Sequence, residues 1–389
     1  MATPSTSAAR DWRLRPWAER ALVALVVAAL AWPGLATAVG LGRPPRRDEP
    51  EVAPGGGLAG AAARFDTQFA YRPSLVRLQA WLRLCLPGVS PLATVWRGRD
   101  GWWCYADDGA VDDATNASAF TTADLEQWRD VLQRTRDWLA ARGIAYVFAI
   151  APDKHVVYPE YLPPGLHRRS GPSRLDQLVA YLRRHSTVPV VDLQAPLAAA
   201  RASGRLFHRT DSHWNDLGAA AAYRAILDAL AVQTPALGAP WPPDAFRLET
   251  RDEPGWDLAE MLGLSSSLRE ETLVLVPARP RRARVTEPVP PPPRYIDGRL
   301  VTEMADSSRP RVVFYRDSFG SALVPFLAEH ASRMVVLWEY DVTPATIRTE
   351  RPAVVIQEWV GRRLYTRQPY DAFAGDGGDG LSSSGTARR

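Results

Sequence analysis

Lysine and cysteine are almost absent from this 389-residue sequence. Only one of its 47 lysine and arginine residues is a lysine, Lys154, and the two cysteines are Cys85 and Cys104. Two cysteines do not by themselves make a zinc site or a disulfide framework, and they leave either one disulfide or two buried thiols. The basic residues form no stripe with interleaved aromatic residues, so nucleic-acid binding finds no support.

The overall charge is nearly balanced, with 47 basic and 43 acidic residues and a formal net charge of +4. Hydrophobic residues make up 46% of the chain, which is typical of a folded protein and excludes a disordered one. The length allows one large domain or two ordinary ones.

The N-terminal region predicts the compartment. A run without charge, residues 21–41, is about as long as a membrane-spanning helix requires, and residues 1–20 before it are rich in arginine. This is either a retained signal-anchor, which we favour, or a signal peptide cleaved near Ala36-Thr37-Ala38. We expect residues 1–20 in the cytoplasm and everything after the run in the periplasm or extracytoplasmic space, anchored by a single pass, or secreted if the signal is cleaved.

The remaining chain has a recognisable organisation. Residues 42–62 are rich in proline, glycine and charge and predict a flexible linker, and residues 366–389 predict a disordered tail. Between them, short buried strands alternate with helices, which predicts a mainly parallel α/β sheet with helices on both faces. Residues 240–310 are expected to be an irregular insertion. The expected strands cover residues 145–150, 188–191, 311–315, 334–338 and 354–357, and the expected helices begin at Thr121 or Thr122, Ser173 and Leu217.

Ser318 lies in a notable position, between an apolar run at residues 312–315 and a helical pattern at residues 322–327. A tight strand-to-helix turn can present a serine hydroxyl at the carboxyl edge of a sheet, next to the first backbone N–H groups of a helix. The alternative is that Asp317 or Ser318 only caps the helix.

A possible base lies about one hundred residues earlier, in the stretch LFHRTDSHWNDL. Asp211 and His213 are two apart, so in an extended segment both side chains point to the same side, and the carboxylate can orient the imidazole. Two other interpretations stay open at this point. The pair could belong to a capped loop, or His208 and Asp211 could join His213 in binding a divalent cation.

The order of several motifs resembles a known family. TDSHWN followed by RDSFG, together with FDTQFAYR, GRDGWWCY, APDKHVVYPEYLP, DLAEMLGL and VVIQEWVGRRL, is similar to the SGNH hydrolase-like domain of the alginate O-acetyltransferase family over residues 63–365. The resemblance implies a three-layer, flavodoxin-like α/β fold. It also implies an O-acetyltransferase of extracytoplasmic polysaccharides, with Ser318 as nucleophile, His213 as general base and Asp211 as its orienter.

The resemblance also implies partners. No bound cofactor or metal is expected. The acetyl group would come indirectly from acetyl-CoA, through a multi-spanning membrane O-acyltransferase partner. Two other functions share these motifs: a carbohydrate acetylesterase with the same triad, and a non-catalytic envelope scaffold.

Five further positions carry weaker expectations. Lys154 is either a surface lysine or a substrate contact at the edge of the site. Trp214 is expected to pack behind His213 or to stack on a sugar. Arg316, where the family commonly has glycine, could contact an acidic sugar. Glu358 and Arg362 are four apart and predict a structural ion pair.

Overall fold

The structure, a computed structural model, describes residues 16–39, 41, 71–84, 92–287 and 298–374. The chain divides into two units, residues 1–82 and 83–389. The first contains helix α1 (Pro16–Ala38) and most of α3 (Arg72–Leu84). No helix among the described residues combines the length and the hydrophobicity that crossing a membrane requires. The expected anchor therefore stays a prediction, and the expected linker at 42–62 lies outside the described residues.

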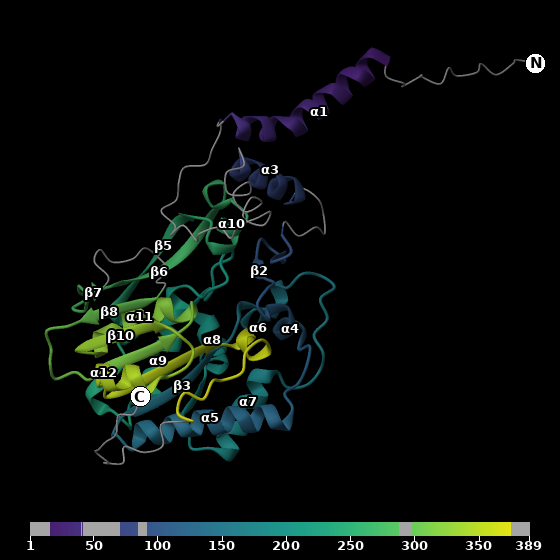
Figure 1. Ribbon diagram of the computed structural model, residues 1–389. Helices are drawn as coiled ribbons and strands as arrows, with labels where there is room; N and C mark the ends of the chain where they lie inside the picture. The colour runs from purple at the N-terminus through teal and green to yellow at the C-terminus, as the bar shows by residue number, and fades with distance from the viewer. Residues whose placement is uncertain (1–15, 40, 42–70, 85–91, 288–297, 375–389) are drawn as a thin grey trace, which may run out of the picture. The chain divides into compact units, whose positions relative to one another are not determined.

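The second unit is built on a seven-stranded sheet with the order β4-β3-β11-β9-β10-β8-β7 (Figure 1). The strands from β4 to β10 pair in parallel, and β8 and β7 add an antiparallel edge, so the predicted mainly parallel sheet is confirmed. The strands are β3 (Ala145–Ala151), β4 (Val190–Asp192), β7 (Arg284–Glu287), β8 (Arg299–Glu303), β9 (Arg311–Arg316), β10 (Arg333–Trp338) and β11 (Val354–Val360).

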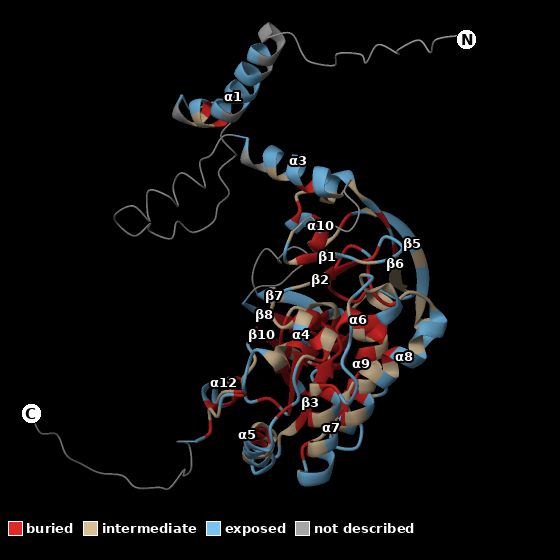
Figure 2. Ribbon diagram, turned by 90° about the vertical axis from the view of Figure 1, so that its right-hand side faces the viewer, coloured by how far each residue is buried: buried red, intermediate tan, exposed pale blue. Residues whose placement is uncertain are grey.

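Alternate residues of the strands face two separate hydrophobic cores. In β3, Val147 and Ala149 pack with helices α8 (Gln194–Ala200) and α9 (Asp216–Leu230), whereas Phe148 and Ile150 pack with α5 (Thr122–Ala140) and α7 (Arg174–His185). Both faces are buried, which explains the continuous apolar runs of these strands. Figure 2 shows the buried residues between the layers and the exposed outer faces of the helices. The three-layer α/β fold is confirmed.

The longer helices begin where their capping residues predict. Thr121 and Ser173 each form a capping box, with Asp124 and Asp176 respectively, at the starts of α5 and α7. Asn215 accepts hydrogen bonds from two backbone N–H groups at the start of α9. The shorter helices are α4 (Ala110–Thr115), α6 (Lys154–Val157), α10 (Asp257–Met261), α11 (Val324–Leu327) and α12 (Pro344–Glu350).

The expectation of an irregular insertion at residues 240–310 is wrong for most of its length. Strands β5 (Phe246–Pro254) and β6 (Arg269–Pro277) form a regular antiparallel hairpin, and β7 and β8 extend the main sheet. The proline run within 288–294 lies outside the described residues. Strands β1 (Val95–Arg97) and β2 (Trp103–Tyr105) form a second two-stranded sheet.

Two further expectations concern single regions. The predicted disordered tail begins too early, because Phe373 is buried and its ring lies 5.0 Å from that of Trp138 in α5. Cys104 in β2 is buried and has no disulfide partner among the residues that the structure describes. Cys85 lies outside the described residues, so its pairing with Cys104 stays a prediction.

Candidate active site

Three neighbouring parallel strands end at the same edge of the sheet and bring the candidate residues together. Lys154 follows β3, Arg362 follows β11 and Ser318 follows β9, and β11 lies between the other two. The carboxyl edge of an open parallel sheet is where ligands of α/β proteins usually bind. The segment 208–213, which we call the dyad segment, lies against this edge from outside the sheet.

The expected contact between Asp211 and His213 is present. Asp211 Oδ1 lies 2.6 Å from His213 Nδ1 and also accepts a hydrogen bond from the backbone N–H of His213 at 2.9 Å. Both residues are buried. The carboxylate accepts the proton of Nδ1, so the neutral imidazole carries its lone pair on Nε2.

The electrostatics of this dyad favour a strong base. Burial alone would lower the pKa of His213, but the charge and hydrogen bond of Asp211 outweigh burial and raise the pKa above its usual value. Burial would likewise raise the pKa of Asp211, but the neighbouring imidazole holds it well below its usual range. Asp211 therefore stays ionised while His213 gains and loses a proton.

Lys154 holds the dyad segment by its backbone. Its ammonium donates to the carbonyl oxygens of His208 and Arg209, each at 3.1 Å, and of Asp211 at 2.5 Å. The side chain is only 4% exposed. An ammonium has three N–H donors, and these contacts use all of them. The structure therefore corrects both expectations for Lys154: it is neither a surface residue nor placed to bind substrate.

Two carboxylates from the region expected to be irregular hold the same segment, and sequence reasoning missed both. Glu270 in β6 accepts hydrogen bonds from the backbone N–H and the hydroxyl of Thr210 at 2.9 and 2.7 Å. Asp257, the first residue of α10, accepts from the backbone N–H of Ser212 at 2.8 Å and from its hydroxyl at 2.5 Å. The only sequence signal was that Asp257 begins the motif DLAEMLGL.

Asp257 is also a second carboxylate at the imidazole. Its Oδ2 lies 3.4 Å from His213 Nδ1. Burial, together with the nearby charge of Asp211, raises the pKa of Asp257 to about 7. Its charge therefore changes in the pH range in which His213 would act as a base.

Ser318 lies in the tight turn that the sequence predicts. It has helical backbone angles (φ −63°, ψ −29°), is partly exposed and makes no side-chain capping hydrogen bond. Asp317 caps the turn instead, accepting from the N–H of Phe319 at 2.9 Å and that of Val360 at 2.7 Å. A Cβ on Gly320 would lie 2.5 Å from the Cβ of Arg316, so this turn requires glycine there.

The turn and the dyad segment contact each other through Phe319. The ring of Phe319 lies 4.9 Å from the imidazole of His213, centre to centre, and its carbonyl accepts a hydrogen bond from Trp214 Nε1 at 3.1 Å. Phe319 and Trp214, which directly follow Ser318 and His213, are thus hydrogen-bonded to each other.

Three other expectations are corrected by burial or pairing. Trp214 is 2% exposed, so it packs behind His213, as one expectation held, and does not present a face to a sugar. Arg316 is 0% exposed and lies over the ring of Trp338 at 4.4 Å, which removes it from substrate contact. Arg362 pairs with Asp153 at 2.5 Å, and not with Glu358 as predicted.

The metal interpretation joined His208 to Asp211 and His213, and the structure replaces His208 by Asp257. Among the described residues, the groups near the dyad that converge closely enough to share a cation are Asp211, His213 and Asp257. His208 instead stacks on Trp256, with ring centres 4.0 Å apart.

Comparisons with known proteins identify relatives of this chain. A stretch of 141 residues is 35% identical to the probable alginate O-acetylase AlgJ of Pseudomonas putida, covering 35% of this chain and 34% of that protein. The match therefore spans about a third of that relative. The structure of Bacillus cereus PatB1 is similar in fold, with a TM-score of 0.51 and 15% identity over 69% of this chain and 96% of that one. The O-acetyltransferase domain of P. putida AlgJ aligns with a TM-score of 0.45 and 25% identity, over 72% of this chain and 96% of that one.

The sequence also matches the model of a protein family. The model of the SGNH hydrolase-like domain of the acetyltransferase AlgX covers residues 95–341, more than half of the chain and all of the strands and turns described above except β11. The chain belongs to the family of AlgX-type SGNH hydrolase-like domains.

Proposed function

We propose that this protein is an O-acetyltransferase that transfers acetyl groups to hydroxyls of a polysaccharide through Ser318, His213 and Asp211. The observation that carries the proposal is the buried Asp211–His213 pair, with 2.6 Å between Oδ1 and Nδ1, in contact with the turn that mounts Ser318. Membership of the AlgX-type family and the similarity to a protein named as a probable alginate O-acetylase support the reaction class and a polysaccharide substrate.

In the first half-reaction, Ser318 Oγ attacks the carbonyl carbon of the acetyl donor. Its proton passes to Nε2 of His213, and Asp211 stabilises the imidazolium that forms. The proton then goes to the leaving group of the donor as its bond to the acetyl group breaks, which leaves acetyl-Ser318. We assign the backbone N–H of Ser318 as one donor to the oxyanion.

In the second half-reaction, a sugar hydroxyl attacks acetyl-Ser318. His213 takes the proton of that hydroxyl and returns it to Ser318 Oγ, and the acetylated sugar leaves. The serine and the imidazole end the cycle unchanged, so the protein's own residues suffice for the chemistry. No bound cofactor takes part in this scheme.

The source of the acetyl group belongs to the same proposal. Acetyl-CoA does not cross a membrane, so a domain held outside the cytoplasm by residues 21–41 needs a multi-spanning membrane O-acyltransferase partner to deliver the group. The arginine-flanked run of the sequence supports this location, in the periplasm or extracytoplasmic space.

The test is transfer from an activated acetyl ester to a polysaccharide acceptor, with the products resolved by mass spectrometry. We expect acetylated polysaccharide from the wild type and none from Ser318→Ala. Ser321→Ala, a serine three residues further along the same turn, is the matched control and should keep its activity. Release of acetate alone, unchanged by acceptor, would mean an acetylesterase. No turnover of any acetyl ester would mean a non-catalytic scaffold.

A further inference from the structure

Helix α3 has an apolar face that is open to solvent. Its sequence is RPSLVRLQAWLRL, and four large side chains of this face are 38–57% exposed: Leu75, Leu78, Trp81 and Leu82. On a helix of about 3.6 residues per turn, the three leucines form one stripe and the tryptophan lies at its edge. We call these four residues the α3 stripe. Figure 2 shows most of α3 as exposed.

The opposite side of the same helix is already covered. Ala80 is 3% exposed, and Val76 and Leu84 are partly buried. These three residues are four apart, so they lie along one side of the helix, away from the α3 stripe. The helix is therefore apolar on two sides, and one of them stays exposed. A contiguous exposed apolar patch of this kind marks a surface that binds a protein or a membrane.

The charge around the α3 stripe has one sign. The helix contains three arginines and no acidic residue, and the longer stretch of residues 67–99 contains five arginines and no aspartate or glutamate. Arg77 and Arg83 are exposed, and the helical spacing places them at the two borders between the α3 stripe and the covered side. Arginine side chains at such borders keep their charge among lipid headgroups while the apolar stripe enters the acyl chains. This charge complements an anionic bilayer surface.

The same charges disfavour a second copy of the chain as the partner. Two α3 helices packed through this face would bring the arginines of one copy close to those of the other. Like charges facing each other across an interface weaken it.

The sequence before α3 brings a membrane within reach. The predicted anchor is the uncharged run 21–41, and residues 42–71 separate it from α3. A flexible chain of about thirty residues has a root-mean-square span of about 30 Å. An anchored run would therefore keep α3 at a high local concentration next to the same membrane surface.

The end of α3 is hydrogen-bonded to the hairpin beside the candidate active site. Arg97 Nη1 in β1 donates to the carbonyl of Leu84, the last residue of α3, at 2.8 Å. In β2 of the same hairpin, the N–H of Trp103 donates to the carbonyl of Arg209 in the dyad segment at 2.9 Å. Two hydrogen bonds and one hairpin thus connect the end of α3 to the dyad segment.

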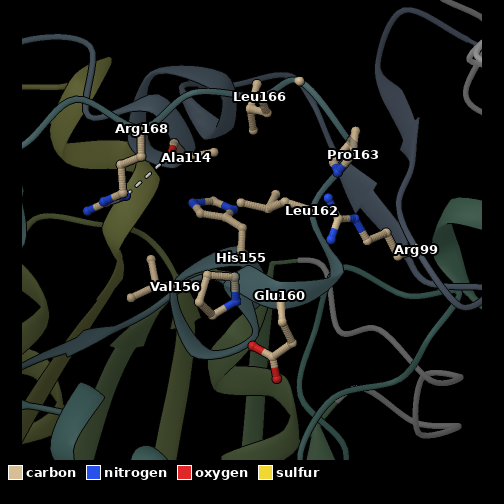
Figure 3. Close-up of a pocket in the computed structure, with 11 residues that line it drawn as sticks. Arg99, Ala114, His155, Val156, Glu160, Leu162, Pro163, Leu166 and Arg168 are labelled. Atoms are coloured by element: carbon tan, nitrogen blue, oxygen red, sulfur yellow. Dashed lines mark hydrogen bonds between the residues drawn. The ribbon is translucent and has the colours of Figure 1, made fainter.

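The turn of this hairpin is fixed in its turn. The N–H of Arg99 donates to the carbonyl of Tyr161 at 2.9 Å, and a Cβ on Gly98 would overlap that same carbonyl oxygen. Figure 3 shows the side chain of Arg99 lining a cavity together with Leu162 and Pro163. The hairpin is therefore a firm attachment for the end of α3.

We propose that α3 is a membrane-binding helix that lies in the surface of a bilayer with anionic headgroups. The α3 stripe would enter the boundary of the acyl chains, and Arg77 and Arg83 would bind the headgroups. Thirteen residues extend over about 20 Å, less than the hydrocarbon thickness of a bilayer, so the helix lies along the surface and does not cross it. This contact would hold the β1–β2 hairpin close to the membrane. The inference does not depend on the acetyl transfer reaction.

The test places an environment-sensitive dye, nitrobenzoxadiazole, on the α3 stripe of the full chain. The dye is attached through Leu78→Cys in a background of Cys85→Ser and Cys104→Ala, and a second protein carries it through Arg183→Cys, an exposed position in α7. Emission is recorded without lipid, with vesicles of phosphatidylcholine, and with vesicles of equal parts phosphatidylcholine and phosphatidylglycerol. We expect brighter, blue-shifted emission at position 78 with the anionic vesicles and no change at position 183.

The arginines are tested by Arg77→Gln with Arg83→Gln. Each arginine near an anionic surface strengthens binding by about fivefold, so the ratio of membrane-bound to free α3 should fall at least about tenfold in the double variant. Arg183→Gln with Arg184→Gln makes the same change of charge at exposed positions of α7 and is the matched control. Its emission from position 78 should equal that of the wild-type background.

Three results would overturn the membrane contact. The first is emission at position 78 that anionic vesicles leave unchanged. The second is a blue shift already present without lipid: if it is independent of protein concentration, another part of the chain covers the α3 stripe, and if it grows with concentration, a second copy does. The third is full binding by an Arg77→Gln, Arg83→Gln protein that melts at the wild-type temperature. Ser318→Ala should show the same emission as the wild type, so this test and that of the proposed reaction can fail separately.

Discussion

Replacing Asp257 by asparagine should lower the pKa of His213. The asparagine oxygen can still accept from the N–H of Ser212, so the dyad segment keeps that support, but the second negative charge near Nδ1 is lost. Asp257 is among the groups that raise the pKa of His213. Without it, the imidazole loses its proton at lower pH.

The size of the change follows from the 3.4 Å between Oδ2 of Asp257 and Nδ1 of His213. Two unit charges at this distance interact by about 1 kcal/mol at the dielectric constant of water and by about 5 kcal/mol at an effective value of 20. Because the pKa of Asp257 is about 7, the carboxylate is only partly ionised near neutral pH, and we take the lower end of the range. An interaction of about 1 kcal/mol corresponds to a shift of about one unit in the pKa of His213.

The assay is an NMR titration of the His213 imidazole, together with the pH dependence of kcat/KM for an activated acetyl ester. A general base works only when neutral, so the acidic limb of the profile should move to lower pH by about one unit in Asp257→Asn. Asp244→Asn, an exposed carboxylate in the same region of the sequence, should leave the profile unchanged. The reasoning is refuted if the His213 titration does not move, or if it moves to higher pH.

Three further predictions concern stability and positioning. Lys154→Met removes the donor to three backbone carbonyls and should lower the free energy of unfolding by at least about 2 kcal/mol in urea denaturation, whereas a surface lysine would change it by less than about 0.5 kcal/mol. Trp214→Phe loses the bond to the carbonyl of Phe319, so kcat should fall with little change in KM; a rise in KM alone would instead indicate a sugar-stacking role. Asp317→Ala leaves two buried N–H groups without their acceptor and should cost about 2–4 kcal/mol by thermal unfolding, and a loss below about 0.5 kcal/mol would contradict the capping role.

Local patterns predicted the parts of the fold that depend on local chemistry. The apolar runs of β3, β9, β10 and β11 are buried on both faces, and such strands have an unmistakable composition. Thr121 and Ser173 start helices because their side chains satisfy N–H groups only a few residues away. Asp211 and His213 are also close in sequence, and their contact followed from spacing.

The missed features depend on contacts between distant segments. Strand β5 has charged residues along most of its length and no buried position, and β6 begins with three charged residues, so the hairpin shows little of the hydrophobic alternation that identifies a strand. Lys154 is buried only because the dyad segment, more than fifty residues away, supplies three carbonyl oxygens. Asp257 likewise contacts Ser212 and His213 although these residues are distant in the sequence, and sequence spacing does not predict such a contact.

The most direct test of the proposed mechanism is the site of the covalent acetyl group. The full chain is mixed with an activated acetyl ester, the reaction is stopped with acid, and the modified peptide is identified by mass spectrometry. We predict one acetyl group on Ser318 in the wild type. Ser318→Ala, His213→Ala and the double variant should lose nearly the same acetylation rate, because residues that act as one unit have non-additive effects. An acetyl group on another residue, wild-type acetylation of a folded Ser318→Ala protein, or single losses that multiply in the double variant would contradict the account.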